Sequence, residues 1–206
     1  VDFTFDNISH AFFQPCGLDM VAILHFRFKV PVLVGKKKVT DLQIYAEPGS
    51  QAEDTNLARR MRDDEDEWEA EEEEKLQRVR LNKDFENFVN LVTSEYKDKV
   101  DFDIPFKELG FNGVPHKSSV MLYPTLNCLI SITENPPFIL ELDQIEWAHF
   151  ERITMNLRNF DLAFILKDYT KPVVKVDAIP TVSLEAVKNW LDKMDIPFTT
   201  SSINVK

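Results

Sequence analysis

The chain has 206 residues, of which 44% are hydrophobic and 29% are charged, and this composition is typical of a globular protein with one or two domains. Its formal net charge is −11, whereas domains that bind duplex DNA usually carry a basic excess, so nucleic acid is not favoured as the main partner. The same charge opposes binding to an anionic membrane surface, and no apolar run approaches the roughly 20 residues that a membrane-spanning helix needs.

The first part of the chain shows the alternation of β-strands. Over residues 20–28 apolar side chains fall on alternate positions, so we expect a strand with one buried face. Pro31 limits the strand pairing that can follow it. The sequence Gly-Lys-Lys-Lys at 35–38 predicts a turn between strands at 32–34 and 39–45.

A dense run of acidic residues at 63–74 follows a loop-like stretch at 47–56. Such a run favours a solvated helix face or a flexible loop, and its functional alternative is a weak site for basic partners. Trp68 within the run suggests a packed side. Beyond it, apolar residues at helical spacing predict an amphipathic helix that starts upstream of Asn82 and ends near residue 96; they are Phe85, Phe88, Val89, Val92 and Tyr96.

The second part of the chain repeats this order of strands followed by a helix. A helix is predicted at 183–195, with Ser183 as its N-cap, and its apolar stripe should close the second set of strands. The tail after Pro197 is expected to be poorly structured. Residues 109–117, which include two glycines and a proline, predict a tight packing corner. The predicted strands are 119–123, 128–133, 138–142, 145–152, 160–167 and 173–177.

These patterns predict a mainly β fold with helices (α+β). We expect two small barrels in tandem, each closed by its C-terminal helix. The first unit would span residues 1–100, with the acidic insertion, and the second residues 101–206. The strand pattern begins at once, so we expect the chain to be a fragment whose first unit is incomplete at its start.

Motifs of catalysis and of metal binding are missing. The sequence has no Gly-x-Ser-x-Gly elbow, no glycine-rich phosphate loop and no Cys-x-x-Cys pair. His25 and His149 lie inside strand patterns and are expected to be structural. Cys16 and Cys128 are expected to be half-buried thiols in a reducing compartment, with a disulfide between them left open. We therefore expect no enzyme, no cofactor and no metal.

Basic residues recur at predicted turns. Lys36, Lys37 and Lys38 share one turn, which is either a solubilising hairpin tip or part of a binding surface. Other cations lie near strand ends in the second unit, where folding could gather them into a patch that meets acidic side chains or DNA phosphate; they are Lys117, Arg152, Arg158, Lys167 and Lys171.

Several segments, in this order, resemble the middle domain of the large subunit of FACT, a eukaryotic histone chaperone. They are 10–15 (His-Ala-Phe-Phe-Gln-Pro), 35–38 (Gly-Lys-Lys-Lys), 108–117, 159–161 (Asn-Phe-Asp), 167–169 (Lys-Asp-Tyr), 178–180 (Ala-Ile-Pro) and 190–191 (Trp-Leu). The resemblance covers nearly the whole chain. It implies a tandem of pleckstrin-homology-like units. The family's histone-binding segment after the second unit and its long acidic tail do not appear in this sequence.

The resemblance further implies a nuclear, chromatin-associated module that reorganises nucleosomes without ATP during transcription, replication and repair. Its partners would be core histones, mainly the central histone pair, and the smaller FACT subunit, with nucleosomal DNA an open alternative and no membrane. A phosphoinositide-binding or peptide-binding scaffold is the competing hypothesis. The candidate histone-binding residues are Lys36, Lys37, Lys38, Lys117, Arg152 and Arg158.

Overall fold

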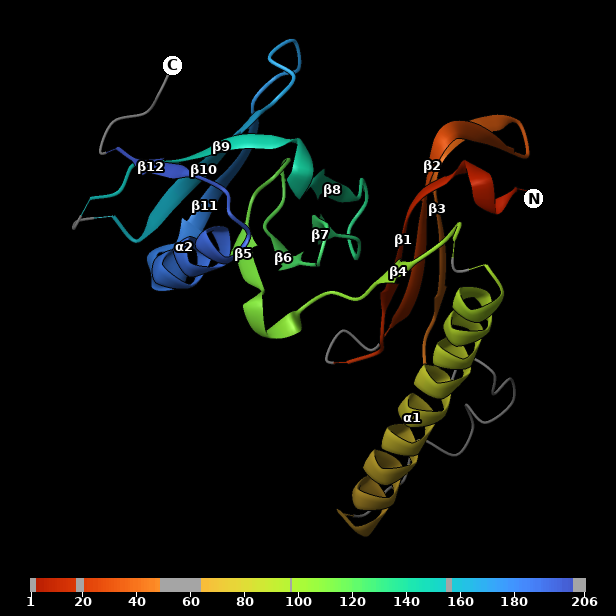
Figure 1. Cartoon of the computed structure of the whole chain (residues 1–206). Coiled ribbons are helices and arrows are strands. Elements are labelled where there is room, and N and C mark those ends of the chain that lie inside the picture. Colours follow the sequence, from red (N-terminus) through yellow and green to blue (C-terminus); the bar gives the residue numbers. More distant parts are fainter. Residues whose placement is uncertain (1–2, 18–20, 49–63, 97, 155–156, 202–206) are drawn as a thin grey trace. The chain divides into compact units, whose positions relative to one another are not determined.

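The computed structural model describes residues 3–17, 21–48, 64–96, 98–154 and 157–201, except for the side chains of 64–70. The chain divides into two compact units, Val1–Ile104 and Pro105–Lys206, and each is described by itself. Each unit has several strands and one α-helix, as the sequence predicts for an α+β fold (Figure 1). Within the described part of the chain, no helix is long and apolar enough to cross a membrane.

Unit 1 is built on a four-stranded sheet with the order β3-β2-β1-β4 (Figure 1). The central strands β1 and β2 are antiparallel, as are β2 and β3, whereas the short β4 runs parallel to β1. The strands predicted at 20–28 and 32–34 form one long strand, because the register shifts between Arg27 and Val32 and this irregularity accommodates Pro31. The strands are β1 (Ile8–Gln14), β2 (Ala22–Val34), β3 (Lys37–Ala46) and β4 (Phe102–Asp103).

Helix α1 (Asp64–Glu95) covers one face of this sheet with its C-terminal half. Val89 and Val92 are buried among strand residues such as Phe26, and Phe85 packs against the same cluster. The predicted stripe is therefore confirmed at these positions. It is wrong at Phe88, which is 44% exposed, because 100° per residue places this side chain about 70° from the centre of the stripe.

From Asp64 onward, the acidic run belongs to the helix. Because α1 begins at Asp64, the predicted start upstream of Asn82 is confirmed. Its N-terminal half extends beyond the sheet, where Glu71, Glu72 and Glu73 are exposed (Figure 1). The predictions for the side chain of Trp68 and for most of the loop at 47–56 lie outside the described residues.

Unit 2 consists of two four-stranded sheets around one core (Figure 1). One sheet has the order β5-β6-β7-β8 and the other β11-β10-β9-β12. Two backbone hydrogen bonds between Val114 and Asp177, of 2.8 and 3.0 Å, join them. The strands are β5 (Phe111–Gly113), β6 (Val120–Pro124), β7 (Cys128–Ser131), β8 (Phe138–Glu141), β9 (Ile145–Glu151), β10 (Asn159–Leu166), β11 (Val174–Pro180) and β12 (Phe198–Thr200).

Helix α2 (Leu184–Lys193) closes this second unit, as predicted. Val187, Trp190 and Leu191 are buried in the core shared with both sheets. Ser183 occupies the N-cap position of α2, as predicted, but its side chain makes no capping hydrogen bond. Ser183 ends a short 3₁₀ turn with φ −87° and ψ −5°, whereas an N-cap side chain usually acts from extended backbone.

The segment after Pro197 was predicted to lack structure, and this prediction is wrong as far as residue 200. Strand β12 pairs in parallel with β9 at the edge of the sheet. Thr199 Oγ1 lies 3.0 Å from Trp147 Nε1 and 2.7 Å from His149 Nδ1. A strand of three residues is too short for periodicity to reveal, so it is recognisable only through its partner.

The predicted packing corner at 109–117 contains the strand β5, which the sequence did not indicate. A Cβ atom on Gly113 would lie 2.5 Å from Val176 Cγ1, and one on Gly110 would lie 2.6 Å from Tyr123 Cε1. These glycines therefore permit a close approach between β5 and β11 and between the preceding turn and β6.

We expect Gly113→Ala to lower the free energy of unfolding of unit 2 by about 1–3 kcal/mol, because the added methyl group overpacks the contact with Val176. Urea denaturation followed by tryptophan fluorescence measures this change. Asn112→Ala on the same strand is the matched control, because Asn112 is exposed, and it should change stability by less than about 0.5 kcal/mol. Equal stability of the two variants would contradict the prediction.

Asp41 on β3 joins a polar cluster with β2. Its Oδ1 lies 3.2 Å from His25 Nε2 and accepts a 3.0 Å hydrogen bond from Arg27 Nε, and Thr40 donates to Oδ2. Partial burial raises the pKa of Asp41, but the hydrogen bonds and the charge of Arg27 outweigh it, so the pKa lies below its ordinary value.

The interactions that lower the pKa of Asp41 stabilise the fold only while its carboxylate is ionised. The destabilisation caused by Asp41→Asn should therefore be fully present at pH 5 and should shrink as the pH falls below about 4, where the unfolded chain takes up the proton. Thermal melts of both proteins between about pH 2 and 5 measure the difference in stability. This pH interval lies below the range in which an unperturbed histidine side chain titrates. A difference independent of pH would show that Asp41 acts only through packing.

Candidate functional site

The three predicted lysines of unit 1 lie at the tip of the β2–β3 hairpin. Gly35 has φ +62°, which lets the chain turn directly into Lys36. Lys37 and Lys38 begin β3, and all three lysines are exposed. Lys38 pairs in register with Leu33, which is 61% exposed. The tip therefore offers cationic and apolar side chains together.

Arg152 of unit 2 belongs to an ion pair within the fold. Its Nε and Nη2 donate to the two carboxylate oxygens of Asp161, a residue that is 6% exposed, and Asp161 Oδ1 also accepts from the backbone N–H of Ala178. Arg152 and Ala178 both have left-handed backbone, with φ 59° and 55°. The hydrogen bond to Asp161 raises the pKa of Arg152 above its ordinary value.

Arg158 and Lys117 lie at two different places in unit 2. Arg158 follows Arg152 in the connection between β9 and β10, its side chain is exposed, and its carbonyl oxygen accepts a hydrogen bond from the backbone N–H of Thr181. Lys117 lies in the connection between β5 and β6, in the other sheet. Arg152 and Arg158 thus belong to one connection and Lys117 to another.

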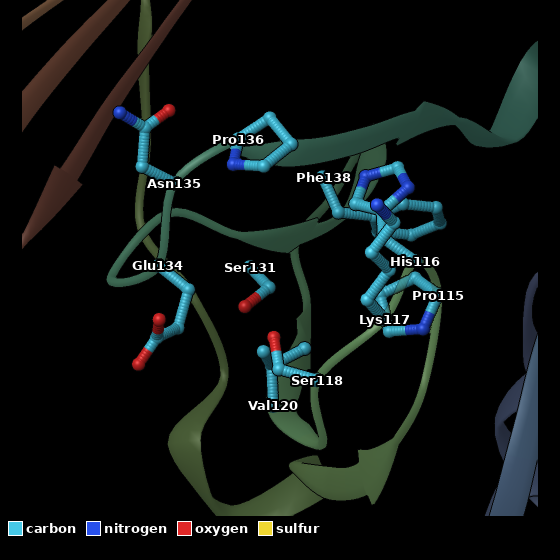
Figure 2. A pocket seen from close by; sticks show the side chains of 10 residues that line it. All are labelled: Pro115, His116, Lys117, Ser118, Val120, Ser131, Glu134, Asn135, Pro136 and Phe138. Carbon is cyan, nitrogen blue, oxygen red and sulfur yellow. The ribbon is translucent and has the colours of Figure 1, made fainter.

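Lys117 lines a pocket of about 400 Å³ between the β5–β6 and β7–β8 connections. Figure 2 shows its lining from close by. His116 and Phe138 lie edge to face on one side, with ring centroids 5.8 Å apart. The other lining residues are Pro115, Ser118, Val120, Ser131, Glu134, Asn135 and Pro136.

The pocket contains a buried hydroxyl group that has no hydrogen-bond partner. Ser131 is 3% exposed, and its Oγ makes no hydrogen bond. In Figure 2 the hydroxyls of Ser118 and Ser131 lie among the lining side chains, while the carboxylate of Glu134 points away from them. Ser118, Ser131 and Glu134 were not predicted as site residues from the sequence. Short turns on separate hairpins give no periodic signal, and only Lys117 and its loop were noted.

Two of the histidines and both cysteines lie where they contribute to the fold. His25 and His149 are hydrogen-bonded to Asp41 and Thr199, in agreement with the structural role predicted for them. Neither Cys16 nor Cys128 forms a disulfide, so the prediction of separate thiols is confirmed, but both side chains are buried and not half-buried. In the ranges that the structure describes, no group of three or more His, Cys, Asp or Glu residues could hold a metal ion.

Two family models match successive parts of the chain. The model described as "FACT complex subunit SPT16 PH-like domain" matches residues 1–92. The model described as "Histone chaperone Rttp106-like, middle domain" matches residues 112–200. The first description names the pleckstrin-homology-like fold that the sequence predicts.

Curated relatives are similar over the whole chain. FACT complex subunit SPT16 from Eremothecium gossypii is 41% identical over 100% of the chain and 21% of its own length. The SPT16 proteins of Candida albicans and Zea mays are 42% and 40% identical, again over 100% of the chain and 20% of their own length. The chain thus spans about a fifth of these relatives. Over its whole length the chain is thus similar to the middle domain of the large subunit of FACT, with its tandem of pleckstrin-homology-like units.

Proposed function

We propose that the chain is a histone-binding module of a nucleosome-reorganising chaperone that acts at chromatin in the nucleus. The observation that supports this proposal is the match of one unit to an SPT16 domain and of the next to a histone chaperone domain. The whole protein would work with the smaller FACT subunit during transcription and replication, without ATP. The chain would act by binding and not by catalysis.

The distribution of charge fits a basic partner. Unit 2 has ten Lys and Arg residues against twelve Asp and Glu, a formal net charge of −2, so the remaining −9 lies in unit 1. The exposed carboxylates near the start of α1 contribute to it. Such a field attracts histones over a distance of about the Debye length, roughly 8 Å at physiological salt. Exposed lysines close to the bound histone would then orient it on the chain.

The lysines of the β2–β3 hairpin and Lys117 are the side chains that we propose to contact histones, mainly the central pair. They are exposed, and none of the ion pairs among the described residues includes them. Such side chains are free to meet acidic histone residues or DNA phosphate. Covering these histone surfaces would keep them from other contacts until the nucleosome reassembles.

Binding of purified core histones at about 0.15 M salt tests the proposal. Retention on the immobilised chain should exceed retention on an unrelated acidic protein of similar net charge. Reversing Lys36, Lys37 and Lys38 to Glu together should weaken binding of the central histone pair about three- to tenfold, because each exposed ion pair contributes little. The same reversal at Lys117 should weaken it about twofold to fivefold.

Lys193→Glu is the matched control, because Lys193 is exposed on α2 and far in sequence from the candidate residues. Its histone affinity should stay within about twofold of the unmodified chain. Retention no greater than on the unrelated acidic protein would overturn the proposed function. Equal affinities of the control and the hairpin variant would remove the lysines from the interface.

Arg152 was proposed as a histone contact, and its ion pair supports a second role in folding. Arg152→Ala would leave the buried carboxylate of Asp161 with the N–H of Ala178 as its remaining hydrogen-bond donor among those described above. We expect the free energy of unfolding to fall by about 1–3 kcal/mol. Arg158→Ala should leave stability within about 0.5 kcal/mol. Comparing both variants in urea denaturation and in histone binding separates a folding role from a contact.

A further inference from the structure

The pocket between the β5–β6 and β7–β8 connections has a feature that the fold itself does not require. Buried polar groups in proteins are nearly always hydrogen-bonded, and a buried hydroxyl without a partner costs about 1–3 kcal/mol. Ser131 Oγ is such a group, at the end of β7 and on the wall of the pocket. A ligand in the pocket would supply the missing partner.

The charged residues around the pocket favour an anionic group on that ligand. The exposed side chain of Lys117 lies on the wall with His116, and the carboxylate of Glu134 points outward (Figure 2). The ammonium of Lys117 and the hydroxyls of Ser118 and Ser131 can all donate hydrogen bonds to a carboxylate. Unit 2 as a whole is close to neutral, with a formal net charge of −2, so it repels an anion only weakly.

The rest of the lining favours an apolar side chain beside that anion. Phe138 and Val120 are 6% and 8% exposed, and both border the pocket together with Pro115 and Pro136. A volume of about 400 Å³ is at the small end of the range of ligand pockets, of the size that one or two side chains of a peptide fill. A large rigid surface could not enter it.

We propose that this pocket binds a short extended peptide in which an acidic residue stands next to an aliphatic residue. The carboxylate accepts hydrogen bonds from Ser131 Oγ and from Lys117 Nζ, and the aliphatic side chain packs on Phe138. The site is a peptide dock within unit 2. It is distinct from the hairpin lysines, which belong to unit 1.

The test uses the whole 206-residue chain and three synthetic peptides. The probe is Ser-Gly-Asp-Leu-Gly-Ser with blocked ends, and the controls replace Asp by Asn or by Arg. Amide chemical shifts of the labelled chain are followed during titration. The Asp peptide should shift resonances of residues 115–120 and 131–138 with a Kd below about 1 mM. The Asn and Arg peptides should bind at least about fivefold more weakly.

Variants of the chain then separate binding from folding. Ser131→Ala should weaken binding of the Asp peptide about three- to tenfold while leaving the midpoint of urea denaturation unchanged or higher, because no internal hydrogen bond is lost. Lys117→Gln should weaken binding about twofold to fivefold, and the control Lys193→Gln should not change it.

Absence of shifts at the pocket, equal binding of the Asp and Asn peptides, or stronger binding of the Arg peptide would each overturn the proposal. Unchanged binding by Ser131→Ala would also overturn it, since the hydroxyl would then make no hydrogen bond to the peptide. No histone is present in the titration, so its failure is separate from failure of histone binding.

Discussion

Burial of an apolar helix face against an open sheet is the constraint on which both units depend. In unit 2 the side chains of Val187, Trp190 and Leu191 enter a core lined by two sheets, and without α2 that core would be open to water. In unit 1, Val89 and Val92 of α1 do the same for one sheet face. Because the helices cover the cores, the hairpin tips and connections need not pack and are available for contacts with partners.

The second constraint is the buried carboxylate of Asp161, which fixes the backbone at Arg152 and Ala178 in unit 2. The carboxylate of Asp161 accepts two hydrogen bonds from the guanidinium of Arg152 and one from the backbone N–H of Ala178. Arg152 and Ala178 both have left-handed backbone. A buried carboxylate with three donors holds these strained conformations in place, because releasing any donor leaves its charge less compensated. An arginine that looks like a surface cation in the sequence is thus tied to the fold.

Charge and shape act at different ranges in this molecule. The carboxylates concentrated in unit 1 produce a diffuse negative field, which acts over the Debye length and has no geometric specificity. Specific recognition requires groups held in fixed positions. The β2–β3 hairpin supplies such groups as exposed lysines at its tip. The pocket around Ser131 supplies them as polar side chains that line a cavity. The proposed histone contact of the hairpin and the proposed peptide dock therefore rest on different physical features, and Lys117 is the residue that the two proposals share.

Local pattern was sufficient for the class of fold, for the helix stripes at Val89 and Val92 and at Val187 and Leu191, and for nearly all strands of unit 2, because each rests on periodicity within about ten residues. It also placed Lys36 on a turn, but Lys37 and Lys38, which were predicted on the same turn, already belong to β3. Local pattern could not predict pairing between segments that are distant along the chain. Strand β12 forms only because it pairs with β9, and the exposure of Phe88 depends on which side of α1 packs against the sheet. The ion pair of Arg152 and the lack of a hydrogen-bond partner for the Ser131 hydroxyl likewise depend on residues that only the folded chain brings near.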